Sequence, residues 1–161
     1  MIVVDANVLS FYMIQGDRTA EAHALKEADP EWLVPAFWTV EFQSILRKYV
    51  RFQGMPLEAA LNLLDQAHAI FSPNEVIPHA DIALRDALHW GITVYDAQYA
   101  SLAKQYGVRC VTEDTLVQKR CTDVALSMAA FLKEHLAGGT VREPQAAYRT
   151  RRRNKPGRKS T

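Results

Sequence analysis

The sequence predicts an α/β domain with a mostly parallel sheet, because short apolar strands alternate with amphipathic helices along most of the chain. The apolar runs are brief, whereas the longer segments between them place apolar side chains at helical spacing. A length of 161 residues suits a single domain with enough apolar content for a core. We therefore expect one domain over residues 1–139, followed by a separate tail.

Turn and cap residues set the ends of the individual elements. The first helix stops near the turn at Gly16, where Asp17 is placed to cap the next helix. Pro56 begins a helix and Gly107 ends one, which are the positions that these residue types favour. We expect strands at residues 1–4, 32–34, 76–77 and 108–112, and helices at residues 6–14, 18–28, 37–52, 56–70, 79–90, 97–106, 114–120 and 124–136.

Three aspartates follow apolar segments that such a fold would bury. Asp5 comes after the first strand, Asp114 after the strand at 108–112, and Asp96 after a short apolar run. The carboxyl ends of parallel strands meet at one edge of a sheet, and ligands bind beyond that edge. We therefore expect the three side chains on one rim. Each also precedes a helix, however, and taken singly a capping role is the better interpretation of each.

Glu41 interrupts the apolar face of a predicted helix. Trp38 is three residues before it and Ile45 four after, so the three side chains share one face. Charged residues are rarely buried without a partner, and a glutamate at the edge of the face that reaches solvent is an equally good interpretation. With the three aspartates, Glu41 completes a set of four acids. Two like charges about 4 Å apart repel by about 4 kcal/mol at an effective dielectric of about 20, so such acids must share protons or bind a cation. A divalent-metal site is the leading hypothesis.

Other polar residues near these acids have simpler explanations. Asn7 and Thr112 are expected to support Asp5 and Asp114, although a turn role for Asn7 is about as good an interpretation. Solvated surface charges are expected at three further acids, which are Asp81, Asp86 and Glu113.

Missing patterns exclude several classes of protein. No apolar run reaches the roughly 18 residues that span a membrane, and no basic segment precedes the first strand as in a signal peptide. We therefore expect a cytoplasmic protein without membrane contact. Cys110 and Cys121 lack metal or redox spacing, and no histidine is placed as a general base. Asparagine at residue 7 argues against a haloacid-dehalogenase phosphatase, and receiver-domain acids, Walker loops and GxGxxG loops are absent.

Charge is distributed unevenly along the chain. Residues 142–161 hold eight basic residues and one acid, a net charge of +7, whereas residues 1–141 hold 11 basic and 17 acidic residues, a net charge of −6. This asymmetry suits a protein that handles a polyanion near a metal site. Residues 140–161 have few large apolar side chains, so we expect a disordered basic tail, and a solubilising terminus is nearly as good an interpretation as an RNA-binding one. The predicted RNA-binding residues are Arg149, Arg151, Arg152, Arg153, Lys155, Arg158 and Lys159.

The order and spacing of the four acids resemble the PIN domain. The matching segments are Val3 to Leu9, Thr39 to Phe42, Tyr95 to Ala103 and Val111 to Leu116. The resemblance covers roughly residues 1–135. The small single-domain layout looks most like the VapC group, the toxin ribonucleases of bacterial and archaeal toxin–antitoxin pairs.

The resemblance implies a three-layer α/β/α fold and an endoribonuclease that depends on Mg²⁺ or Mn²⁺. The family's acids map onto Asp5, Glu41, Asp96 and Asp114. Asp5 and Asp96 are the preferred metal ligands and Asp114 is a further one, while Glu41 and Asp114 could each complete the catalytic set as a second ligand or as a partner of the attacking water. The choice of Asp114 over Glu113 depends on the T-x-D motif alone. The other polar positions of the family's motifs map onto Asn7 and Thr112.

The resemblance also implies partners besides RNA. PIN domains of this kind commonly form homodimers, and the toxins bind an antitoxin that masks the acidic site. Most large apolar residues are expected in the core and some at such a surface, and they are Trp32, Phe37, Trp38, Phe52, Met55 and Trp90. Two alternatives stay open, which are an RNA-processing nuclease that is not a toxin and a non-catalytic RNA-binding module.

Overall fold

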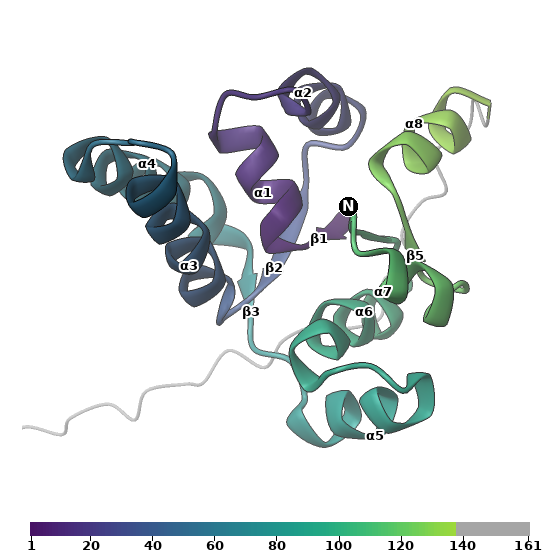
Figure 1. The fold of residues 1–161 in the computed structure, drawn as a ribbon. Helices are drawn as coiled ribbons and strands as arrows, with labels where there is room; N and C mark the ends of the chain where they lie inside the picture. Colours follow the sequence, from purple (N-terminus) through teal and green to yellow (C-terminus); the bar gives the residue numbers. More distant parts are fainter. Residues whose placement is uncertain (138–161) are drawn as a thin grey trace, which may run out of the picture.

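The computed structural model describes residues 1–137, and its centre is a parallel sheet of five strands (Figure 1). The strands lie in the order β3-β2-β1-β4-β5, so the first strand of the chain is in the middle of the sheet. All neighbouring strands pair in parallel, which requires a crossover connection between them. The strands are β1 (Ile2–Val4), β2 (Trp32–Pro35), β3 (Glu75–Val76), β4 (Cys110–Val111) and β5 (Ala125–Leu126).

Helices cover both faces of this sheet, which confirms the predicted α/β class and the three-layer α/β/α arrangement. In Figure 1, α1, α2 and α8 lie on one side of the strands and α5 and α6 on the other, while α3 and α4 form a hairpin at the left. The helices are α1 (Ala6–Met13), α2 (Thr19–Ala28), α3 (Trp38–Phe52), α4 (Leu57–Phe71), α5 (Ala80–Trp90), α6 (Val94–Tyr106), α7 (Thr115–Arg120) and α8 (Met128–Ala137), with a short 3-10 helix η1 at Ser72–Asn74.

Successive side chains of β1 pack into two separate cores. Ile2 and Val4 belong to the cluster that includes α1, α2, α3, α4 and α8, whereas Val3 belongs to the cluster with α5, α6 and α7. All three side chains are at most 1% exposed. Because neighbouring residues of a strand point to opposite faces, a strand covered on both faces needs an apolar residue at every position. The first polar residue, Asp5, therefore lies where the strand leaves the core.

The structure corrects three local predictions. Asp17 does not cap α2, whose capping position is Arg18. The helix that carries Asp96 begins at Val94, so part of the apolar run predicted to precede Asp96 is already helical. The segment at 124–136, predicted as one helix, contains β5 before α8 begins. Two residues are enough to pair with β4 but too few to show a strand pattern in the sequence.

The three tryptophans are core residues and do not supply a partner surface. Trp32 and Trp38 are 0% exposed and Trp90 is 6% exposed. Phe52, in contrast, is 70% exposed at the end of α3. The large apolar groups of the sequence thus divide into a core majority and an exposed minority, as expected.

Two expectations concern the limits of the domain. The predicted basic tail, residues 140–161, lies outside the described residues, so its state and its contacts stay predictions. Within residues 1–137, every helix is too short or too polar to cross a membrane.

Candidate active site

A cavity of about 330 Å³ lies where the segments that follow β1 and β4 meet helices α3 and α6. All four predicted acids and both of their predicted neighbours line it, namely Asp5, Asn7, Glu41, Asp96, Thr112 and Asp114. The side chains come from four separate parts of the chain and meet beyond the carboxyl ends of the central strands, which is where parallel sheets bind ligands. The structure thus brings the predicted residues together, while the chemical role of each stays a prediction.

Asp5 is the most deeply buried acid of the cavity, with 8% of its surface exposed. It caps α1, because its Oδ1 accepts a hydrogen bond of 2.8 Å from the main-chain N–H of Val8. Burial raises the pKa of the Asp5 carboxyl to about 6, and the negative charge of Glu41 adds to the rise, whereas hydrogen bonds from Thr112 and Val8 oppose it. A charged Asp5 is therefore costly unless a positive charge enters the cavity.

Thr112 joins two of the acids through one hydroxyl group. Its Oγ1 donates a hydrogen bond to Oδ2 of Asp5 and accepts one of 3.0 Å from the main-chain N–H of Asp114. Asp114 caps α7, because its Oδ1 accepts hydrogen bonds of 2.7 Å and 3.0 Å from the N–H groups of Leu116 and Val117. The capping roles predicted for Asp5 and Asp114 are therefore confirmed, and both residues still line the cavity.

Glu41 is half-buried and bonded to a helix on the other side of the cavity. The hydroxyl of Tyr99 on α6 donates a hydrogen bond to Oε2 of Glu41 on α3. Burial raises the pKa of Glu41, and the charge of Asp96 adds to the rise, whereas the bond from Tyr99 opposes it. Glu41 thus has a partner within the fold, and its side chain is neither fully buried nor fully exposed.

Asp96 is held by the cap of its own helix. Thr93 is the N-cap of α6, and its Oγ1 donates a hydrogen bond of 2.6 Å to Oδ2 of Asp96. The same oxygen accepts a bond of 3.2 Å from the main-chain N–H of Asp96. The prediction that Asp96 is the cap is wrong, because Thr93 takes that position three residues earlier. The carboxylate of Asp96 is therefore not the N-cap of α6, and it lines the cavity.

Glu113 is bonded within the fold and is not the solvated charge that was expected. Its Oε2 accepts a hydrogen bond of 3.1 Å from Arg18, and its Oε1 accepts one of 2.9 Å from the main-chain N–H of Met128. These bonds tie the segment between β4 and α7 to α2 and α8. Glu113 does not line the cavity, whereas Asp114 does, which agrees with the choice of Asp114 for the site.

Asp86 is also not the surface charge that was expected. It is 5% exposed, and it accepts hydrogen bonds of 2.8 Å from Ser101 and 2.7 Å from Lys104. These bonds join α5 to α6, the helix that carries Asp96. Asp81, five residues earlier on α5, is exposed as predicted.

Sequence reasoning missed several residues of the cavity, among them Tyr99 and Lys48. Tyr99 lies three residues after Asp96, and Lys48 lies seven residues after Glu41, so each shares a helix face with a predicted acid. Helical spacing from each acid was therefore the signal that could have found them. In the sequence, however, a tyrosine in an apolar helix is indistinguishable from an ordinary core residue, and a lysine on a helix is indistinguishable from a solvated surface charge.

The donor chemistry of the cavity suits a hard divalent cation, because carboxylate oxygens are the ligands that Mg²⁺ and Mn²⁺ prefer. Within residues 1–137, one oxygen each of Glu41, Asp96 and Asp114 accepts no hydrogen bond. The same part of the chain holds no group of three or more His, Cys, Asp or Glu side chains close enough together to bind an ion. The residues therefore fit a cation by their chemistry, and their side chains would have to draw closer to hold it.

Comparisons with known proteins agree with this architecture. The model of the PIN domain family matches residues 2–121. Over 117 residues the chain is 28% identical to a protein named Ribonuclease VapC3 from Pyrobaculum aerophilum, a match that covers 70% of this chain and 88% of the relative.

Solved structures show the same fold at lower identity. PAE2754 from Pyrobaculum aerophilum matches with a TM-score of 0.66 and 23% identity, over 84% of this chain and 89% of that one. FitAcB from Neisseria gonorrhoeae matches with a TM-score of 0.61 and 17% identity, over 80% and 99%. A chain in the structure of FitAB bound to an IR36 DNA fragment matches with a TM-score of 0.62 and 15% identity, over 80% and 95%. The fold and the family match over most of the chain show that this protein belongs to the PIN domain family.

Proposed function

We propose that this protein is an endoribonuclease that depends on Mg²⁺ or Mn²⁺ and serves as the toxin of a type II toxin–antitoxin pair in the cytoplasm. The observation that carries the proposal is the convergence of Asp5, Glu41, Asp96 and Asp114 on one cavity. Membership of the PIN family and the similarity to a protein named as a VapC ribonuclease support the reaction and the substrate class.

Asp5, Asp96 and Asp114 would hold the cation. When bound, it would supply positive charge that offsets the charge developing on the phosphodiester, and it would make a nearby water more acidic. Burial disfavours the charged form of Asp5 and raises the pKa of that carboxyl in the metal-free protein, so the positive charge of the cation would stabilise its carboxylate most. The Thr112 hydroxyl bonds the Asp5 carboxylate and the main-chain N–H of Asp114, so it fixes the Asp5 side chain relative to the backbone that carries Asp114.

Glu41 would accept the proton of the attacking water. Its Oε2 is taken by the Tyr99 hydroxyl, whereas its Oε1 accepts no hydrogen bond from residues 1–137. A raised pKa brings a carboxylate closer to the pH at which a general base works well. Oε1 is therefore the proton acceptor in this proposal.

Cleavage assays on a structured RNA test the proposed reaction. Activity should require Mg²⁺ or Mn²⁺, disappear in EDTA and leave 5′-phosphate and 3′-hydroxyl ends. Asp5→Asn and Asp96→Asn should abolish it, whereas Asp81→Asn, at an exposed position on α5, should retain it. Undiminished cleavage in EDTA, or a 2′,3′-cyclic phosphate product, would rule out the metal-dependent mechanism.

The toxin role and the partners need separate tests. A small antitoxin gene immediately upstream and growth arrest on expression would support a toxin, whereas neither would be expected of an RNA-processing enzyme. The proposed homodimer predicts twice the monomer mass by light scattering at micromolar concentration. Exposed apolar side chains of α4, among them Leu57 and Leu61, are available for either protein partner.

A further inference from the structure

One face of α3 continues from the acidic cavity to the outer end of the helix. Glu41, Ser44 and Lys48 line the cavity, and Arg51 follows Lys48 by three residues. Residues separated by three or four positions lie one above the other on a helix, so these side chains form one row. The row begins with an acid of the cavity and ends with cations.

The cations of this row have no ionic partner in the described part of the chain. Among the described residues that line the cavity, Lys48 is the only cation, although four acids line the same space. Within residues 1–137, neither Lys48 nor Arg51 forms an ion pair, and both are exposed. A lysine that neutralised the carboxylates would lie in contact with one of them. Both side chains are therefore available to a negatively charged ligand that passes the cavity.

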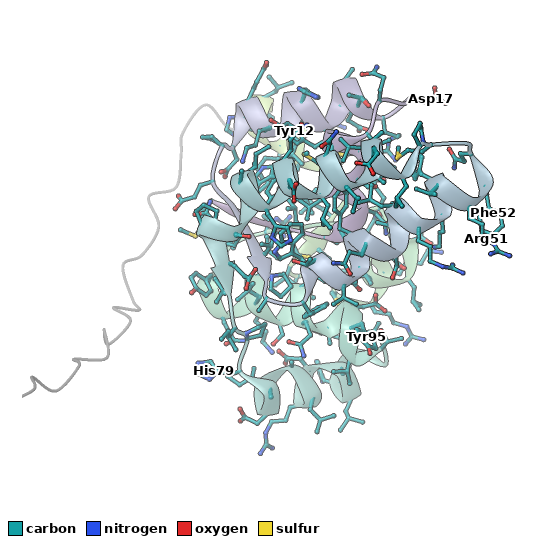
Figure 2. All side chains as sticks on the ribbon, turned by 90° about the vertical axis from the view of Figure 1, so that its left-hand side faces the viewer. Tyr12, Asp17, Arg51, Phe52, His79 and Tyr95 are labelled. Atoms are coloured by element: carbon teal, nitrogen blue, oxygen red, sulfur yellow. The ribbon has the colours of Figure 1, made fainter. Side chains whose placement is uncertain are left out.

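An exposed aromatic ring lies at the end of the row. Phe52 is 70% exposed, and the guanidinium carbon of Arg51 is 5.5 Å from the centre of its ring. Figure 2 shows both side chains at the outer end of the α3–α4 hairpin, pointing away from the rest of the molecule. An aromatic face beside cations is the pairing that single-stranded nucleic acids use, because bases stack on the ring while phosphates contact the charges.

The length of the row suits several nucleotides. A helix rises about 1.5 Å per residue, so Phe52 lies about 16 Å along the axis from Glu41. Stacked nucleotides are about 3.4 Å apart, and the row corresponds to about five of them, or fewer in an extended strand. A strand cut in the cavity would therefore extend along α3 for a short distance only.

We propose that this row, named here the α3 track and made of Ser44, Lys48, Arg51 and Phe52, binds single-stranded RNA beside the scissile phosphate. Lys48 contacts the phosphate next to the cleaved one, Arg51 contacts a phosphate further along, and one base stacks on Phe52. The inference depends on the proposed ribonuclease function, and it adds a binding site on the folded domain itself, separate from the predicted basic tail.

Binding of a fluorescent single-stranded RNA to the full chain tests the α3 track. The Asp5→Asn background prevents cleavage during the measurement. Lys48→Ala and Arg51→Ala should each weaken binding and each reduce the slope of log K against log salt by about 0.7. Phe52→Leu should weaken binding five-fold or more, whereas Phe52→Trp should restore it, because stacking needs an aromatic face. Lys133→Ala and Arg85→Ala, at exposed cations on α8 and α5, are matched controls and should leave affinity unchanged.

Kinetics separate this inference from the proposed function. In the active protein, the Arg51 and Phe52 variants, which lie outside the cavity, should raise KM for a longer RNA and leave kcat unchanged, with no effect on a dinucleotide too short to reach Phe52. Equal affinities for track and control variants would overturn the track while leaving the nuclease intact. Weakened binding of an acidic polypeptide with unchanged RNA binding would also overturn it, because the row would then serve a protein partner. If the unaltered protein cleaves no RNA with any divalent metal, the proposed nuclease function is wrong, whatever the binding measurements show.

Discussion

The hydroxyl of Tyr99 donates a hydrogen bond to Oε2 of Glu41 and so connects α6 to α3 across the cavity. Tyr99 is 3% exposed, and its ring packs edge-on against Phe37 at 5.4 Å between centroids. Burial and the adjacent charge of Glu41 raise the pKa of Tyr99 far above its ordinary value, so the hydroxyl stays a donor at every working pH. The orientation of the Glu41 carboxylate therefore depends on a residue that is itself rigidly packed.

Replacement of this donor should impair cleavage without unfolding the domain. Tyr99→Phe keeps the ring but frees the Glu41 carboxylate, and loss of such a supporting bond costs about 10- to 100-fold in activity. The loss should appear in kcat and not in KM, measured with RNA at saturating metal. Tyr106→Phe, on the same helix and without a hydrogen bond from its hydroxyl within residues 1–137, is the control. Equal activity of the two variants would contradict the role of Tyr99.

The stability of the metal-free protein should fall as the pH rises. The pKa of folded Asp5 is about 6, above the ordinary value of 3.8, so its stabilising contribution is complete below about pH 4 and is lost as pH rises through 6. At 1.36 kcal/mol per pKa unit, the loss amounts to about 3 kcal/mol. The raised pKa of Glu41 acts in the same direction. Urea unfolding in EDTA at pH 4 and pH 7 measures the loss.

Asp5→Asn should remove most of this pH dependence and make the metal-free protein more stable at pH 7. Asp81→Asn, at an exposed carboxylate, should leave the dependence in place. A pH dependence that survives Asp5→Asn would show that another group is responsible.

Asp86 should be needed for folding stability and not for chemistry. Asp86→Ala leaves the buried Ser101 hydroxyl without its acceptor and removes the ion pair with Lys104, which should cost about 1–3 kcal/mol in the free energy of unfolding. Urea unfolding measures this cost, and the matched change Asp81→Ala should cost far less. If both variants unfold at the same urea concentration, the bonds between α5 and α6 contribute little.

The predicted basic tail should change how RNA binding responds to salt. Each phosphate neutralised on a single strand contributes about −0.7 to the slope of log K against log salt. If about four tail residues engage, deletion of residues 142–161 should flatten the slope by about 3. Cleavage of a short substrate at saturation should survive the deletion. An unchanged slope would identify the tail as a bystander and leave the α3 track as the main cationic contact.

Local features of the fold and site were predictable from the sequence, whereas long-range bonds were not. Asp5 and Asp114 follow strands and cap helices, and both facts depend only on neighbours in the chain. The burial of Asp86 depends on Lys104 and Ser101, which lie on another helix. The sequence around Asp86 therefore does not show that this aspartate is buried.

The same distinction explains the errors at element boundaries. Thr93 was overlooked because Asp96 is itself a good capping residue, and only the backbone shows which of the two begins the helix. β5 is defined by its pairing with β4, a contact that a two-residue pattern cannot reveal.

The position of β1 in the middle of the sheet has a consequence for the order in which the chain is made. Asp5 is made before both neighbours of β1, and Asp114, which follows β4, is the last of the four acids to be made. Pairing between strands that are distant in the sequence forms late in folding, because the chain loses loop-closure entropy before the contacts that compensate for it can form. A nascent chain that ends before Asp114 therefore carries no complete acidic cavity, and the proposed nuclease would gain its full set of acids only after residue 114 has been made.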